Sequence, residues 1–256
     1  MYRERALAIA GPRALLMQAA HPLAVAGLLA HTGALERPYE RLARTAEVMN
    51  TITFGTREEA DRATRRVRAI HRRVSGNLAQ PAGPFPAGTP YRADDPELLM
   101  WILYTLVDSA IVVYSKYVGG LDDAEQERFW SDYRVVGRLF GLRKRDMPAD
   151  LEGLRRYARE MATGGKLVVT PWARTRAREI VLEPPLPLYL RPLVESLNFI
   201  TIALLPEPIS AQYGFSPLPP PWVRRALVAG GAEYARRVIV PVLPERLRLV
   251  PARAAA

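Results

Sequence analysis

The sequence predicts an all-α protein that folds as a single multi-helix domain. Apolar residues recur at helical spacing along most of the chain, helix-capping residues stand before several periodic segments, and prolines separate those segments. The 23 prolines fall largely at 81–90, 184–192 and 217–221, where they end helices and stiffen connections. We expect one domain over residues 1–256, because no linker divides the chain, with a flexible C-terminal tail at 241–256.

The first predicted element is a buried helix or helix pair in the apolar stretch from Ala14 to Ala30, with a break near Pro22. This stretch is also long enough to be considered as a signal core or a marginal membrane span. Gln18 and His21 interrupt it, however, and hydrocarbon would leave their polar groups without partners. We therefore expect no transmembrane segment and no export signal, which gives a soluble, cytoplasmic protein.

Two helices are predicted next, over about 38–52 and 57–75. Thr56 and Glu59 form a capping box at the start of the second helix, and Gly76 is predicted to end it in the left-handed conformation. The inward face of the first helix is expected to contain Leu42, Thr45, Met49 and Ile52. The inward face of the second is expected to contain Ala60, Ala63, Val67, Ile70, His71 and Val74.

Acidic N-caps mark two further helices. Asp95 precedes a long apolar helix to about Val118, and Asp122 with Glu125 precedes a helix to about Phe140. The remaining helices are expected over 149–163, 170–182, 188–205, 221–229 and 232–240.

Composition excludes several classes of site. The chain has no cysteine, which rules out disulfides and cysteine zinc sites, and its sequence has neither a nucleophile elbow, a His-Glu-x2-His motif nor a dinucleotide fingerprint. The net charge of +10 comes mainly from arginines that recur along the chain. We expect these to be dispersed over solvated helix faces, with no specific nucleic-acid partner, although a basic module that docks on membranes or nucleic acid is an alternative.

Three residues around the predicted helix pair are candidates for a binding site. His71 falls on an apolar stripe, where an imidazole is either a satisfied core residue or a ligand for haem iron. Arg41 and Thr45 lie one helical turn apart, so their side chains are neighbours. The arginine can hold a propionate or a polar substrate, or simply pair with a carboxylate, and the threonine can donate to bound oxygen or to its own backbone.

Two other residues have open interpretations. His21 stands in apolar surroundings and either lines the same cavity or serves the core at the helix break. Asp108 is a lone carboxylate on a nearly all-apolar helix, so it requires a partner. A structural salt bridge with an arginine and an anchor in a pocket both satisfy that requirement. His31 is expected at a helix end on the surface.

Six short motifs follow one another in order over about residues 10–230. They are Leu15-Leu16-Met17-Gln18-Ala19-Ala20-His21-Pro22, Arg41-x2-Arg44-Thr45, Phe54-Gly55-Thr56, His71-x2-Val74-x-Gly76, Tyr91-x-Ala93-x-Asp95-Pro96 and Trp101-x3-Thr105-x2-Asp108-Ser109. This series resembles the bacterial MpaB-type oxygenase family, which shares its catalytic domain with the rubber oxygenase called latex clearing protein.

The resemblance implies a globin-like helical core that holds one haem b, with its iron, and an O2-dependent oxidation of an apolar small molecule. His71 would be the proximal iron ligand, Arg41 and Thr45 would lie in the haem pocket, and Arg44 would stand where the rubber enzyme has a lysine. His21 and Asp108 are further candidates for contact with the cofactor. Residues 15–35 contain no acid at the place of the rubber enzyme's glutamate base, so polyisoprene is not the expected substrate. A haem-binding sensor or carrier without turnover is the alternative.

Overall fold

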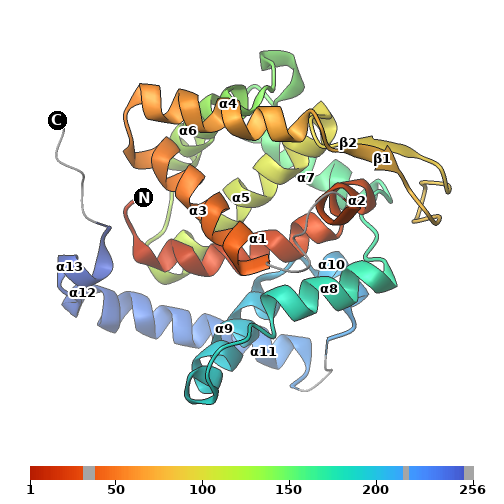
Figure 1. Ribbon diagram of the computed structural model, residues 1–256. Coiled ribbons are helices and arrows are strands. Elements are labelled where there is room, and N and C mark those ends of the chain that lie inside the picture. Colours follow the sequence, from red (N-terminus) through yellow and green to blue (C-terminus); the bar gives the residue numbers. More distant parts are fainter. Residues whose placement is uncertain (31–37, 216–218, 251–256) are drawn as a thin grey trace.

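Helix α5 (Pro96–Tyr117) lies at the centre of the fold, and its neighbours in space come from both halves of the chain (Figure 1). The computed structural model describes residues 1–30, 38–215 and 219–250. Asp95 caps α5 by accepting a hydrogen bond from the Glu97 backbone N–H at 2.8 Å, as predicted. Among the described helices, α5 alone has the length and hydropathy of a membrane span, and 56% of that stretch is buried inside the fold, as in the core helix of a soluble protein.

The apolar N-terminal stretch forms a helix pair, which confirms that prediction. Helix α1 (Ala10–Ala19) packs along α5, and α2 (Pro22–Ala30) follows after a break at His21. Proline at the first position of α2 explains the break, because its ring would clash with the preceding turn of a continuous helix. The buried Tyr213 hydroxyl donates to the Leu16 carbonyl at 2.7 Å and ties α1 to the C-terminal half.

Helices α3 (Pro38–Phe54) and α4 (Arg57–His71) are joined by a short turn at Gly55. The predicted capping box is present, since Thr56 Oγ1 accepts from the Glu59 N–H at 3.2 Å and the Glu59 carboxylate accepts from the Thr56 N–H at 2.8 Å. A Cβ at Gly55 would lie 2.5 Å from the Thr51 carbonyl oxygen, so the turn has no room for a side chain. The predicted extension of α4 to Ser75 was wrong, because the helix ends at His71.

Gly76 does not end a helix in the left-handed conformation, which corrects a second prediction. It lies in strand β1 (Ser75–Asn77), opposite Tyr91 of strand β2 (Pro90–Arg92), in a small antiparallel hairpin. A Cβ at Gly76 would lie 2.5 Å from the Tyr91 hydroxyl oxygen. The glycine is therefore required by close packing and not by its backbone conformation.

The rest of the chain forms helices around this core. They are α6 (Asp123–Phe140), α7 (Leu151–Thr163), α8 (Pro171–Val181), α9 (Arg191–Leu204), α10 (Glu207–Tyr213) and α11 (Pro221–Tyr234). Helix α10 was not predicted. The break predicted near residue 230 was wrong, because α11 continues through a π-helical turn (Ala235–Ile239) into α12 (Val240–Val242).

The two ends of the described chain lie side by side. Residues 245–248 form the short helix α13, and the Val250 N–H donates to the Arg3 carbonyl at 2.7 Å. The Arg248 guanidinium pairs with the buried Glu4 at 3.3 Å. The expected flexible tail at 241–256 thus has helical structure and backbone contacts as far as Val250, and its last six residues lie outside the described part.

Candidate functional site

The helix pair α3–α4 sets the positions of the candidate residues Arg41, Thr45 and His71. Arg41 precedes and His71 follows the turn at Gly55 by about four helical turns each. The two helices diverge from that turn in Figure 1, so both residues lie toward the open end of a V. The side chain of Arg41 lies outside the described part of the structure, and the backbone of α3 gives only its position along the helix.

His71 is the last residue of α4 and is half-buried. Its carbonyl accepts from the Val74 N–H at 3.0 Å, in the tight turn that leads into β1. Asp94 lies close enough for an electrostatic interaction with the imidazole. The pKa of Asp94 is lowered first by its hydrogen bond from Arg92, at 3.0 Å, and to a smaller extent by the charge of His71. The sequence pattern did not identify Asp94 as a site residue, although Asp94 lies inside one of the six motifs.

Thr45 and Arg44 are both exposed on α3. Arg44 makes a long ion pair with Glu40, one turn earlier, at 3.9 Å. Ile70, predicted to face inward, is 58% exposed, which corrects that assignment, and Thr64 is the buried residue of α4 that the prediction omitted. Thr45 was also predicted to face inward, and its exposure corrects that assignment as well.

His21 is the most completely buried of the candidates. Its exposed fraction is 1%, and burial lowers its pKa to about 4, so the ring is neutral at physiological pH. Within the described residues neither ring nitrogen has a hydrogen-bond partner, and the ring lies 5.6 Å from that of Phe85. Glu97 and Asp95, at the start of α5, and Lys166 also act electrostatically on His21.

Asp108 has the salt bridge that one of its two interpretations required. Its carboxylate lies 2.7 Å from the buried guanidinium of Arg13. Arg13 also donates to the Leu204 carbonyl at 2.8 Å and to Ser109 Oγ at 2.7 Å, and so connects α1, α5 and the end of α9. The pKa of nearby Tyr104 is raised by burial first and by the Asp108 charge second. These contacts give Asp108 a structural role in the core.

Neither of the two best-formed cavities is lined by His71 or Thr45. A small cavity of about 80 Å³ lies between α1, α5, α7 and α10 and is lined by residues such as Met17, Trp101 and Met161. An open groove of about 600 Å³ runs between α9, α11 and the end of α5, with Tyr117 and Phe199 among its lining residues. Within the described ranges no three His, Asp or Glu side chains converge as a metal site.

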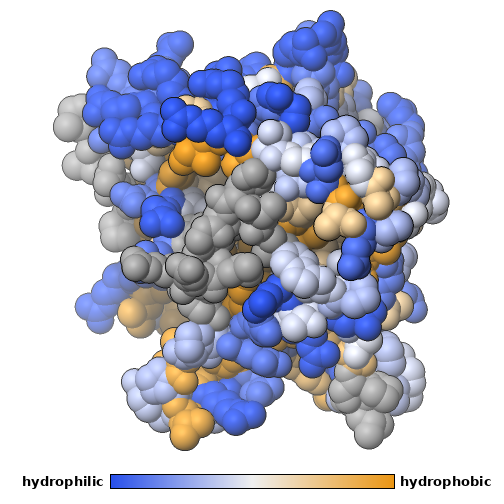
Figure 2. All heavy atoms as spheres, turned by 45° about the vertical axis from the view of Figure 1, so that its right-hand side comes forward, coloured by the Kyte–Doolittle hydropathy of each residue, from blue (hydrophilic) through white to orange (hydrophobic). Residues whose placement is uncertain are grey.

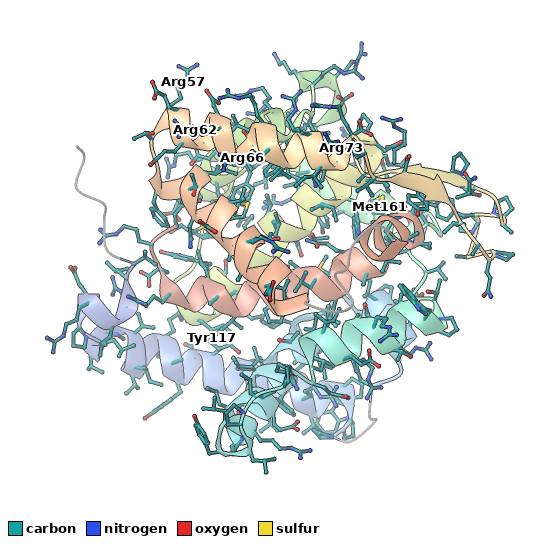
Figure 3. The ribbon with its side chains drawn as sticks, in the orientation of Figure 1. Arg57, Arg62, Arg66, Arg73, Tyr117 and Met161 are labelled. Carbon is teal, nitrogen blue, oxygen red and sulfur yellow. The ribbon has the colours of Figure 1, made fainter. Side chains whose placement is uncertain are left out.

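The outer face of α4 gathers positive charge, which departs from the expected dispersal of the arginines. The exposed arginines of α4 and of the turn that follows it, several of which are labelled in Figure 3, include Arg62, Arg65, Arg66, Arg68, Arg72 and Arg73. None of these six makes an ion pair with another described residue. The chain has no acidic residue between Asp61 and Asp94, so these arginines have no acidic neighbour close after them in the sequence.

Comparison with protein families gives one match that spans nearly the whole chain. The model of the ER-bound oxygenase mpaB/B'/rubber oxygenase catalytic domain matches residues 1–248. Comparisons with curated proteins and with solved structures gave no match. The family match includes the helix pair, His71 and the start of α5, and it agrees with the resemblance found in the motifs. The chain therefore belongs to the mpaB/rubber oxygenase family of oxygenase catalytic domains.

Proposed function

We propose that this protein is a haem b-dependent oxygenase that oxidises an apolar small molecule with O2. The observation that carries the proposal is the half-buried imidazole of His71 at the end of α4, in a chain that matches an oxygenase catalytic domain over residues 1–248. Arg41 stands about four turns and Thr45 about three turns from the Gly55 turn on the opposite arm, which brings them toward the same open end.

The donor set suits haem better than a bare metal ion. A metal held by protein side chains alone needs several ligands together, and the described residues form no such group. Haem iron is held by its porphyrin and commonly takes one histidine from the protein. His71 can supply that single ligand. Asp94 beside it supports the assignment, since ligating histidines commonly interact with a carboxylate that orients the ring.

The other residues of the site would bind the cofactor and orient O2 and the substrate. Arg41 and Arg44 would hold the haem propionates through charge-assisted hydrogen bonds. To do so, the exposed Arg44 would give up only its long ion pair with Glu40, at 3.9 Å. The exposed Thr45 hydroxyl would donate a hydrogen bond to a polar atom of the cofactor or of O2. Apolar Ile70 and the half-buried Val67 would cover an apolar substrate and exclude water. The cofactor itself supplies the activation of O2.

Haem binding by a His71→Gly variant tests the assignment of the ligand. Protein expressed with added hemin should show a Soret band in the wild type and little or none in His71→Gly. Because the substitution removes only the imidazole, added free imidazole should restore the band. His31→Ala serves as the matched histidine control and should keep it.

Two outcomes would contradict the proposal at different levels. A normal Soret band in folded His71→Gly without imidazole would remove His71 as the ligand. Stable haem with no consumption of O2 and no product from unsaturated apolar compounds, in the presence of an electron donor, would favour the alternative of a sensor or carrier. Circular dichroism of each variant separates loss of haem from loss of the fold.

A further inference from the structure

Two segments of the C-terminal half expose unusually large apolar side chains. Leu188 and Tyr189 of the short 3-10 helix η4 (Leu188–Leu190) are 80% and 79% exposed, and Trp222 in the first turn of α11 is 72% exposed. Leu186 and Leu193, on either side of η4, are also more than half exposed. Scattered single apolar residues are normal on a surface, but a concentration of this size indicates an interaction surface.

Both segments project from the body of the protein. The η4 segment and the start of α11 lie at the lower end of the molecule in Figure 1, and in Figure 2 that end carries orange apolar atoms at its tip. Prolines at 184, 185, 187 and 192 restrict the backbone of the η4 segment. The Asn198 side-chain amide donates to the Leu182 carbonyl at 2.7 Å and fixes the base of the segment to α9. The apolar tip is therefore held out toward solvent.

The charges beside these tips are balanced. Arg191 pairs with Glu195 at 3.6 Å, and Arg225 pairs with Glu207 at 3.4 Å. Arg57, Arg62 and Arg66 of α4 and Arg73 after it lie at the other end of the molecule (Figure 3). Leu188 and Tyr189 lie in one segment and Trp222 lies in the other, and this combination of leucine with aromatic residues suits a bilayer surface. Leucine enters the acyl region, and aromatic side chains prefer the headgroup level.

We propose that the η4 segment and the start of α11 dock on the surface of a lipid bilayer. A projecting apolar tip fits a fluid lipid surface, because the lipid deforms around the tip and needs no preformed complementary pocket. The balanced ion pairs favour zwitterionic lipid and make the binding insensitive to salt. The inference is independent of haem and goes beyond the proposed oxygenase function.

The absence of cysteine permits a direct test. In the variant Leu188→Cys, the single cysteine is labelled with an environment-sensitive fluorophore. The control is Val135→Cys on α6 with the same label, because Val135 is also apolar and is 46% exposed. With phosphatidylcholine vesicles, the probe at position 188 should shift its emission to the blue and the probe at position 135 should not. The shift at position 188 should persist at high salt.

Substitutions give the second readout. Leu188→Ser with Tyr189→Ser should lower the partition coefficient into phosphatidylcholine vesicles by roughly tenfold or more, because each buried apolar side chain contributes about that factor. Val135→Ser should leave it unchanged. A blue shift at position 188 that needs no vesicles and accompanies a doubled molecular mass would overturn lipid docking in favour of a second copy. Binding only to anionic vesicles or to duplex DNA, and its loss in salt, would assign it to the arginines of α4 and also overturn the proposal.

Discussion

Replacement of His21 by phenylalanine should remove a large part of the acid sensitivity of this protein. In the folded chain burial lowers the pKa of His21 to about 4 from an ordinary value of 6.5. At a pH between these two pKa values, His21 binds a proton in the unfolded chain but not in the folded chain. The free energy of unfolding therefore falls as the pH falls through this window. For these pKa values the loss attributable to His21 between pH 7 and pH 4.5 is about 2 kcal/mol.

The measurement is urea unfolding of wild type and His21→Phe at both pH values. The carboxylates titrate equally in the two proteins, so the variant should lose about 2 kcal/mol less than the wild type on acidification. At pH 7 the free energy of unfolding of the variant should be within about 1.5 kcal/mol of the wild-type value. The substitution removes two buried nitrogens that lack hydrogen-bond partners in the described structure, and it preserves the ring contact with Phe85. Phe85→Leu is the control, and its effect should be the same at both pH values. An equal acid-induced loss in His21→Phe and wild type would refute the burial of a neutral His21.

Three further substitutions test the packing around the candidate site. Gly76→Ala places a Cβ 2.5 Å from the Tyr91 hydroxyl oxygen, so chemical denaturation should show a loss of roughly 1–3 kcal/mol in the free energy of unfolding. Adding Tyr91→Phe, which removes that hydroxyl, should reduce the loss. If the effects of the two substitutions simply add, the clash is contradicted. Arg13→Leu leaves the Asp108 carboxylate without its partner and should cost roughly 3 kcal/mol in the free energy of unfolding, whereas unchanged stability with weaker haem binding would make Asp108 a pocket residue. Thr56→Ala removes the cap of α4 and should cost about 1 kcal/mol by the same measurement, a loss that Thr53→Ala on exposed α3 should not reproduce.

The helix starts were predictable because their signals are local. Thr56, Asp95 and Asp122 each cap a helix in the structure with the hydrogen bond expected from the sequence. Such a cap depends on a side chain and a backbone group at most three residues apart, so no information from elsewhere in the fold is needed. The break at Pro22 was predictable for the same reason.

Features that depend on distant partners were missed. Gly76 was expected at a helix end, but Tyr91, in the opposite strand, is the residue that requires it. Neither strand has a periodic pattern of its own, since each is three residues long. Ile70 was assigned to the core by its helical spacing alone, and it is 58% exposed. Spacing predicts a face but does not predict how far a neighbouring element covers it.

Some residues of the candidate site could be found from local sequence patterns, and others only from the fold. Periodicity and spacing selected His71 and Thr45 but left each with an ordinary structural alternative. The family match over residues 1–248 identifies an oxygenase catalytic domain, and haem binding at His71 stays a prediction. Asp94 beside His71 could not be found by spacing, because the residues between them turn through the β hairpin. For Asp108, the prediction that the carboxylate needs a partner was correct, and only the fold identifies that partner as the buried Arg13.

The two proposals concern opposite ends of the molecule, and this separation makes their tests independent. The α3–α4 pair lies at the upper end in Figure 1 and η4 lies at the lower end, with the buried residues of α1 and α5 between them. A substitution at His71 therefore has no contact through which to change the exposed tip at Leu188, and the reverse also holds. Loss of haem in His71→Gly with intact vesicle binding, and loss of vesicle binding in Leu188→Ser with intact haem, would assign each function to its own end. Joint loss in either variant would mean that the fold, and not a site, had been changed.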